Sequence, residues 1–301
     1  MTHGGDVVRL ANFEAAKDQI KTTRIGSIVK LPGSLRCVSL LEKDEARTVY
    51  VGGSDGVIYG LNTSTHELAD TWNINEPITA MDVCSSAKGG CLIVASTERN
   101  RIYMRVDWEE VEKQYECAKT INDLKMIGHG STVLAACEDR YLYVLTNNSR
   151  NYFSNSKRID LESSTPRSIF VMEQKVLVAT DDNKTFLVSL SDFKYKLLDD
   201  KNDNGGLLKS LSARLRYSFK TEKKNYQLPV ACTPKILLMA SPEGWLHYSR
   251  DKDTLASKVV GCFGHLSSVA SDIVITPDLR FALVAGSSDR TLLNYRLTLG
   301  N

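Results

Sequence analysis

Short apolar segments joined in pairs by tight turns recur along most of the chain, and this repetition limits the fold more than any other feature. The segments have four to seven residues and are rich in Val, Ile, Leu, Tyr and Thr, which favours β-strands over helices. The stretches "CLIVASTERNRIYMRVD" (91–107) and "FALVAGSSDRTLLNYRL" (281–297) show the pattern. The turns carry an acidic residue or an asparagine, at Asp55, Asn100, Asp139, Asn183, Glu243 and Asp289.

The spacing of these turns indicates how the strands are arranged. Successive turn residues are 45, 39, 44, 60 and 46 residues apart. A further apolar segment precedes most hairpins, as at 36–41, and another follows, as at 67–72. A period near 45 residues with four strands in each unit is typical of a β-propeller. We therefore predict an all-β chain that forms a single closed β-propeller of four-stranded blades, in which six blades can be counted and seven is the alternative.

The two ends of the chain indicate how the ring closes. The last repeat ends at Leu297 without a fourth strand, and the apolar segment Ile25–Leu31 precedes the first blade without a blade of its own. A free strand edge promotes aggregation, and pairing these two segments would leave neither of them with a free edge toward the other. We expect residues 25–31 to pair with 291–297 and close the ring. The predicted organisation is an N-terminal arm at 1–24 and a propeller at 25–301, with an insertion at about 199–227.

Composition and charge argue against several classes of protein. The net charge of +2 gives no overall attraction to nucleic acid or to an anionic membrane. The seven cysteines contain no Cys-x-x-Cys pair and the five histidines are scattered, so no zinc-like spacing is present. No apolar stretch approaches the ~18 residues that cross a bilayer, and the N-terminus lacks a secretory signal pattern. We expect an intracellular, cytoplasmic chain, with the nucleus as an alternative, that has no membrane insertion and no cofactor.

The last repeat resembles a WD repeat. Gly264 and His265 match its Gly-His pair, Asp289 matches its turn aspartate, and Tyr295 stands where Trp is usual. In the WD-repeat family a His, a Ser or Thr, the turn Asp and the Trp form a buried hydrogen-bonded chain that locks the blade. A tyrosine keeps a polar tip that can bond when buried. The resemblance therefore implies a structural blade lock made of His265, Ser287, Asp289 and Tyr295.

The resemblance to the WD-repeat family also implies a function, because such propellers hold protein partners on their faces and rim. We predict a non-enzymatic scaffold that mediates protein–protein interactions within a multi-protein assembly. The closing repeat is similar to those of echinoderm-microtubule-associated-like and axonemal WD proteins, which implies a cytoskeletal or ciliary assembly. No phosphate-binding glycine loop and no Ser/His/Asp spacing stands out, so no catalytic residue is assigned.

Two other functions remain as alternatives. Residues 50–72, "YVGGSDGVIYGLNTSTHELADTW", resemble one repeat of a quinoprotein-type propeller, including its closing Trp72, which implies a catalytic propeller. The segment 209–224 carries lysines and arginines among Leu, Tyr and Phe, which suits a nucleic-acid-associated scaffold. Acidic residues at 199, 200 and 203 lie directly upstream and weaken the nucleic-acid interpretation.

Basic residues near the hairpin turns form the candidate partner-binding site. In a propeller these turns open on the same face as the connections between blades, so we expect the insertion at 199–227 over that face. An arginine can hold a carboxylate by two hydrogen bonds. We therefore expect an acidic protein segment as the partner, in preference to nucleic acid and with no small-molecule substrate. The candidate residues are Arg99, Arg140, Arg214, Arg216, Lys223, Lys224 and Arg290.

Overall fold

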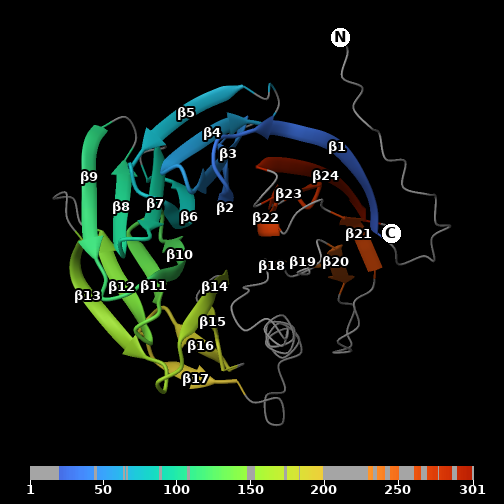
Figure 1. The fold of residues 1–301 in the computed structure, drawn as a ribbon. Coiled ribbons are helices and arrows are strands. Elements are labelled where there is room, and N and C mark those ends of the chain that lie inside the picture. The colour runs from blue at the N-terminus through green and yellow to red at the C-terminus, as the bar shows by residue number, and fades with distance from the viewer. Residues whose placement is uncertain are drawn as a thin grey trace.

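The computed structural model contains six four-stranded antiparallel sheets, arranged as blades around a central axis, which we name the channel (Figure 1). It describes residues 20–43, 46–63, 65, 67–87, 90–106, 109–147, 153–172, 175–182, 184–198, 230–232, 236–240, 245–250, 261–265, 270–276, 278–286 and 290–299. The prediction of an all-β propeller with four-stranded antiparallel blades is confirmed.

Each of the first five blades is built from four consecutive strands. Blade 1 contains β2 (Leu35–Lys43), β3 (Ala46–Gly53), β4 (Val57–Asn62) and β5 (Leu68–Asn73). Blade 2 contains β6 (Ile78–Ser85), β7 (Cys91–Thr97), β8 (Arg101–Val106) and β9 (Glu109–Glu116). Blade 3 contains β10 (Ile121–Ile127), β11 (Thr132–Cys137), β12 (Tyr141–Asn147) and β13 (Phe153–Asp160). Blade 4 contains β14 (Pro166–Met172), β15 (Lys175–Thr180), β16 (Thr185–Ser189) and β17 (Tyr195–Leu197). Blade 5 contains β18 (Val230–Cys232), β19 (Ile236–Ala240), β20 (Trp245–Arg250) and β21 (Gly261–His265).

Blade 6 combines strands from both ends of the described chain. It contains β22 (Ala270–Ile275), β23 (Phe281–Gly286), β24 (Thr291–Leu299) and β1 (Ile20–Lys30), with β1 beside β24. The two strands pair antiparallel, from Ile20 opposite Leu299 to Lys30 opposite Thr291. Residues 20–24, which the sequence assigned to the N-terminal arm, therefore belong to this blade. The rest of the arm, 1–19, and the insertion at 199–227 lie outside the described residues.

The hydrophobic core lies between neighbouring blades. The inner strands alternate in burial, as in β10, whose pattern is characteristic of a strand with apolar residues on one side. Val94 and Met104 of blade 2 are fully buried in one cluster with Leu124 and Val133 of blade 3. Trp72 belongs to the corresponding cluster between blades 1 and 2 and is 6% exposed. Apolar packing between the flat faces of the blades therefore holds the ring together.

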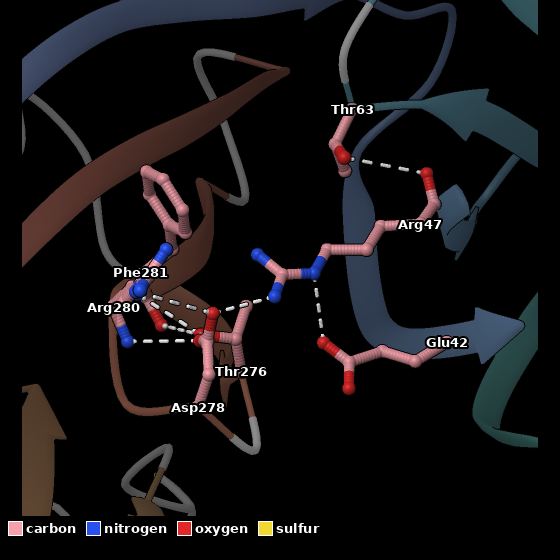
Figure 2. Close-up of polar contacts among 7 residues, drawn as sticks. All are labelled: Glu42, Arg47, Thr63, Thr276, Asp278, Arg280 and Phe281. Carbon is pink, nitrogen blue, oxygen red and sulfur yellow. Dashed lines mark hydrogen bonds and ion pairs between the residues drawn. The ribbon is translucent and has the colours of Figure 1, made fainter. Parts of the chain in front are cut away.

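An ion-pair cluster joins blade 1 to blade 6 on the face opposite the β3–β4 turn (Figure 2). Arg47 Nε lies 2.9 Å from Glu42 Oε1, and a terminal nitrogen of the same guanidinium lies 2.5 Å from Asp278 Oδ2 in the β22–β23 turn. Asp278 also accepts hydrogen bonds from the Thr276 hydroxyl and the Arg280 backbone N–H. Burial alone raises the pKa of Asp278, but these bonds and Arg47 outweigh it and lower the pKa. The carboxylate therefore stays charged and holds the two blades together.

Candidate partner-binding face

The hairpin turns between the second and third strands lie on the same face as the connections between blades, and we name this the turn face. Backbone hydrogen bonds join each turn to the neighbouring connection. Ile74 N–H donates to Gly56 O at 2.9 Å in blade 1, and Cys117 N–H donates to Asn100 O at 2.8 Å in blade 2. Because these bonds fix the described loops to one another, this part of the turn face is held in place on the strands of the propeller.

Four hairpin turns on this face end in a residue with a left-handed backbone conformation. The φ angles are 76° at Gly56, 62° at Asn100, 78° at Arg140 and 59° at Arg290. Glycine and asparagine adopt this conformation at the least cost, whereas a longer side chain costs about 1 kcal/mol. Arginine is therefore an unfavourable choice for the fold at positions 140 and 290.

The turn aspartates of blades 1 and 3 bind the third strand of their own blade. Asp55 accepts hydrogen bonds from the Val57 backbone N–H at 3.3 Å and from the Tyr59 hydroxyl at 2.7 Å. Asp139 accepts a hydrogen bond from the Tyr143 hydroxyl in the same way. Burial and the bond to Asp55 raise the pKa of Tyr59 to about 12, so the hydroxyl remains a donor. These two aspartates are structural residues of their turns.

Blade 2 has Arg99 at the turn position where blades 1 and 3 have aspartate, and a distant glutamate takes the aspartate's role. Glu76 lies in the connection between β5 and β6, and its side chain is 7% exposed. It accepts hydrogen bonds from the Thr97 hydroxyl at 2.7 Å, from Arg101 at 2.9 Å and from the Tyr103 hydroxyl at 3.4 Å. In all three blades a tyrosine hydroxyl of the third strand therefore bonds to a carboxylate.

Sequence reasoning missed these tyrosine–carboxylate pairs, although a signal was present. A tyrosine stands at the third position of the third strand in "VIYGLN", "RIYMRV" and "YLYVLT". The partner of Tyr103 could not be found from the repeat spacing, because Glu76 lies 27 residues earlier and outside the hairpin. Only the packing of blade 2 against the preceding connection brings the two together.

The first strands of blades 1, 2, 3, 4 and 6 each contain a β-bulge at the end nearest the turn face. In each strand the pairing register shifts at the second residue. A bulge re-aims the side chain that it carries. The first strands lie nearest the centre of the ring (Figure 1), so the bulged residues lie around the end of the channel on the turn face, which we name the channel mouth. They are Arg36, Thr79, Asn122, Arg167 and Ser271.

Two of the bulged residues are arginines that pair across blade junctions. Arg36 of blade 1 lies 2.6 Å from Glu98 Oε1 in the turn of blade 2. Arg167 of blade 4 lies 3.0 Å from Glu138 Oε1 in the turn of blade 3, and donates a hydrogen bond to Asn122. Partly exposed pairs of this kind contribute up to about 1 kcal/mol each. They orient the arginines at the channel mouth more than they stabilise the fold.

Three of the candidate partner-binding residues are exposed on the turn face. The Arg99 side chain is 71% exposed and lies 3.6 Å from Glu76 Oε1. Arg140 and Arg290 are exposed, and no ion pair joins either of them to another described residue. The other four candidates, Arg214, Arg216, Lys223 and Lys224, lie outside the described residues. The described part of the site thus consists of three arginines from blades 2, 3 and 6.

Polar side chains of the first strands connect successive blades around the channel, and we name Ser39, Asp82, Asp123 and Asp272 the inner ring. Each accepts a hydrogen bond from a backbone N–H of the next blade's first strand, on the edge of that strand that no other strand pairs with. The bonds run from Val38 to Asp272 (2.7 Å), from Val83 to Ser39 (3.3 Å), from Met126 to Asp82 (2.8 Å) and from Ile169 to Asp123 (2.7 Å). The inner ring therefore satisfies edge donors that would otherwise need water.

One lysine lies among the carboxylates of the inner ring. Burial alone lowers the pKa of Lys125, but the charges of Asp123, Asp82 and Asp272 outweigh it and raise the pKa above its usual value. Burial raises the pKa of Asp272 to about 7, although the N–H groups of Val38 and Ile273 and the charge of Lys125 lower it. Asp272 is therefore partly protonated near neutral pH.

The titration of Asp272 predicts that its contribution to the free energy of unfolding falls as pH rises. Because its pKa is higher in the folded chain than the usual 3.8, the folded protein keeps a proton that the unfolded chain releases. Between about pH 4 and pH 7 each rise in pH therefore favours unfolding, by up to about 4 kcal/mol over the whole window. Asp272→Asn stays neutral and should lack this loss. Urea unfolding at pH 4.5 and pH 8 should show the wild type losing stability relative to the variant, and a constant difference would contradict the assignment.

The predicted blade lock of the last repeat is described only in part. Tyr295 lies in β24 and is 2% exposed. His265 ends β21, where its backbone pairs with Trp245 of β20, but its side chain is outside the described part. Ser287 and Asp289 lie outside the described residues. The lock of these four side chains stays a prediction.

Metal-binding clusters, disulfides and membrane-spanning helices are absent from the described part of the chain. No group of three or more His, Cys, Asp and Glu side chains that could hold a metal ion occurs in the described part of the chain. All five cysteines whose side chains are described carry free thiols. Within the described ranges no helix is long and apolar enough to cross a membrane.

The fold is that of a β-propeller. Among solved structures, the chain is similar to the β-propeller domain of Cps50 (Swd1) from Myceliophteria thermophila, with a TM-score of 0.56. The similarity covers 92% of this chain and 100% of that one, at 12% sequence identity, so it concerns the fold alone. No protein-family model and no curated protein sequence matches the chain.

Proposed function

We propose that the chain is a non-enzymatic scaffold that holds protein partners within a multi-protein assembly, with the turn face as its working surface. The observation that carries this proposal is the set of exposed arginines that three separate blades present on that face: Arg99, Arg140 and Arg290. Loops on a rigid framework are where binding residues usually lie. The propeller fold supports the proposal because the described blades present such loops on one face.

The chemistry of this face favours an acidic protein segment as the partner. A guanidinium group binds a carboxylate by two parallel hydrogen bonds, and Arg140 and Arg290 can accept such a ligand without losing an ion pair to another described residue. Nucleic acid is a weaker candidate, because the net charge is only +2 and the Tyr143 ring is fully buried, so bases cannot stack on it. We place the assembly in the cytoplasm, at the cytoskeleton or a cilium, on the resemblance of the last repeat.

Replacing the candidate arginines and lysines should remove the partner without unfolding the chain. The variant carries serine at Arg99, Arg140, Arg290, Arg214, Arg216, Lys223 and Lys224. Proteins captured by the wild type and identified by mass spectrometry should be acidic in the bound segment and should be lost from the variant. Capture by the wild type should also fall steeply as ionic strength rises, because the attraction is screened.

The matched control removes positive charge from the opposite face. Arg280, with a side chain that is 76% exposed, lies in the β22–β23 turn, and Lys175 is exposed at the start of β15. Changing both to serine should leave capture unchanged. Equal loss of partners from both variants, or capture that ignores ionic strength, would show that the turn face is not the working surface.

A further inference from the structure

Arg140 and Arg290 occupy the same place in their blades. Each is the last residue of the turn between the second and third strands, and each has the left-handed φ described above, 78° and 59°. Blade 1 has glycine and blade 2 has asparagine at this place, the residue types that the conformation favours. A long side chain in a strained backbone position often marks a binding site, because the strain is tolerated for the contact that the side chain makes.

The two arginines belong to blades on opposite sides of the ring. Arg140 belongs to blade 3 and Arg290 to blade 6, and two blades separate them on either side of the channel (Figure 1). A ligand that contacts both must therefore pass over the channel mouth. Around that mouth lie Arg36 and Arg167, whose charges are matched by Glu98 and Glu138. Arg140 and Arg290 are exposed and form no ion pair with another described residue, so they offer positive charge to an anionic ligand at opposite sides of the ring.

We infer that Arg140 and Arg290 are the two anchors of a single extended acidic segment that lies across the mouth of the channel on the turn face. This inference rests on the proposed function and adds to it the path, the span and the end contacts of the partner. Each guanidinium binds a carboxylate near one end of the segment. Because the second contact forms within a complex that is already held by the first, two moderate contacts yield tight binding.

The test uses two fluorescein-labelled peptides, one of ten glutamates and one of three, titrated with the full chain at low ionic strength. Ten extended residues reach roughly 33 Å and three reach roughly 10 Å, so we expect only the longer peptide to join opposite blades. The wild type should bind the longer peptide at least about tenfold more tightly. Arg140→Gly and Arg290→Gly should each weaken binding of the longer peptide about tenfold, and the double variant should bind both peptides alike.

Stability measurements separate this role from a structural one. Each Arg→Gly variant should melt about 2 °C higher than the wild type, because glycine relieves the left-handed strain. Asn100→Gly is the matched control, since it changes the same turn position in blade 2 without removing a guanidinium; it should leave peptide affinity unchanged. Variants that melt higher but keep full affinity for the longer peptide would overturn the inference while leaving the proposed function standing. A wild type that binds neither peptide would overturn the acidic partner as well.

Discussion

A chain that lacks residues 1–32 should lose most of its stability, with a melting temperature lower by at least about 10 °C or no cooperative transition at all. The deletion removes all of β1 and so exposes β24 along a pairing that runs from Thr291 to Leu299. It also removes Leu31, which is 6% exposed and packs with Leu35, Leu283 and Leu292 between blades 1 and 6. Loss of one buried leucine costs about 2–5 kcal/mol, a large share of the usual stability of a domain.

The control for this experiment is deletion of residues 1–19, which leaves β1 in place. Circular dichroism at increasing temperature should show a much smaller change for the shorter deletion than for the longer one. If both truncated chains melt at the temperature of the full chain, β1 contributes nothing to the stability of blade 6.

Glu76→Ala should be the most destabilising single substitution on the turn face. The carboxylate is the hydrogen-bond acceptor of the Thr97 hydroxyl, which is fully buried, and of the Tyr103 hydroxyl, which is 8% exposed. Each buried hydroxyl left without a partner costs about 1–3 kcal/mol. Arg101 is partly exposed and can be hydrated instead, so we expect a total loss of about 2–5 kcal/mol in urea unfolding.

Glu98→Ala is the matched control for Glu76→Ala, because it removes a glutamate from the same part of blade 2. Glu98 pairs with Arg36, and its side chain is 49% exposed. Its loss should lower stability by less than about 1 kcal/mol. Glu76→Gln keeps one acceptor oxygen and should give an intermediate result. Equal effects of the two alanine substitutions would show that Glu76 is not the acceptor on which the blade 2 turn depends.

The hairpins at the centre of each blade could be predicted from the sequence because their signals are local. Each pairs two apolar segments around a short polar turn, as in residues 48–62, which form most of β3 and all of β4. The beginning of β1 could not be predicted in this way. Residues 20–24 read "IKTTR" and contain one apolar residue, so the strand becomes evident only from its pairing with β24.

The turn face was only partly predictable from the sequence, because only some of its features depend on local sequence signals. Arg99, Arg140 and Arg290 could be found because they lie directly in the turns of the repeat. The bulges that place Arg36 and Arg167 at the channel mouth depend on pairing register, which no single segment specifies. The strain at Arg140 and Arg290 depends on their backbone angles. An arginine in the sequence does not predict a left-handed conformation, whereas glycine or asparagine often does.

The pairing of β1 with β24 also determines when the molecule becomes complete during translation. The ribosome makes β1 before every other described strand and makes β24 after all of them. Blades 1 to 5 can form from consecutive residues as they emerge, but blade 6 waits for a contact between distant parts of the chain, which is intrinsically slow. Until then β1 has an unpaired edge that can accept a strand from another nascent copy. Newly made chains are thus most vulnerable to misassembly in the interval between the first and the last strand to leave the ribosome.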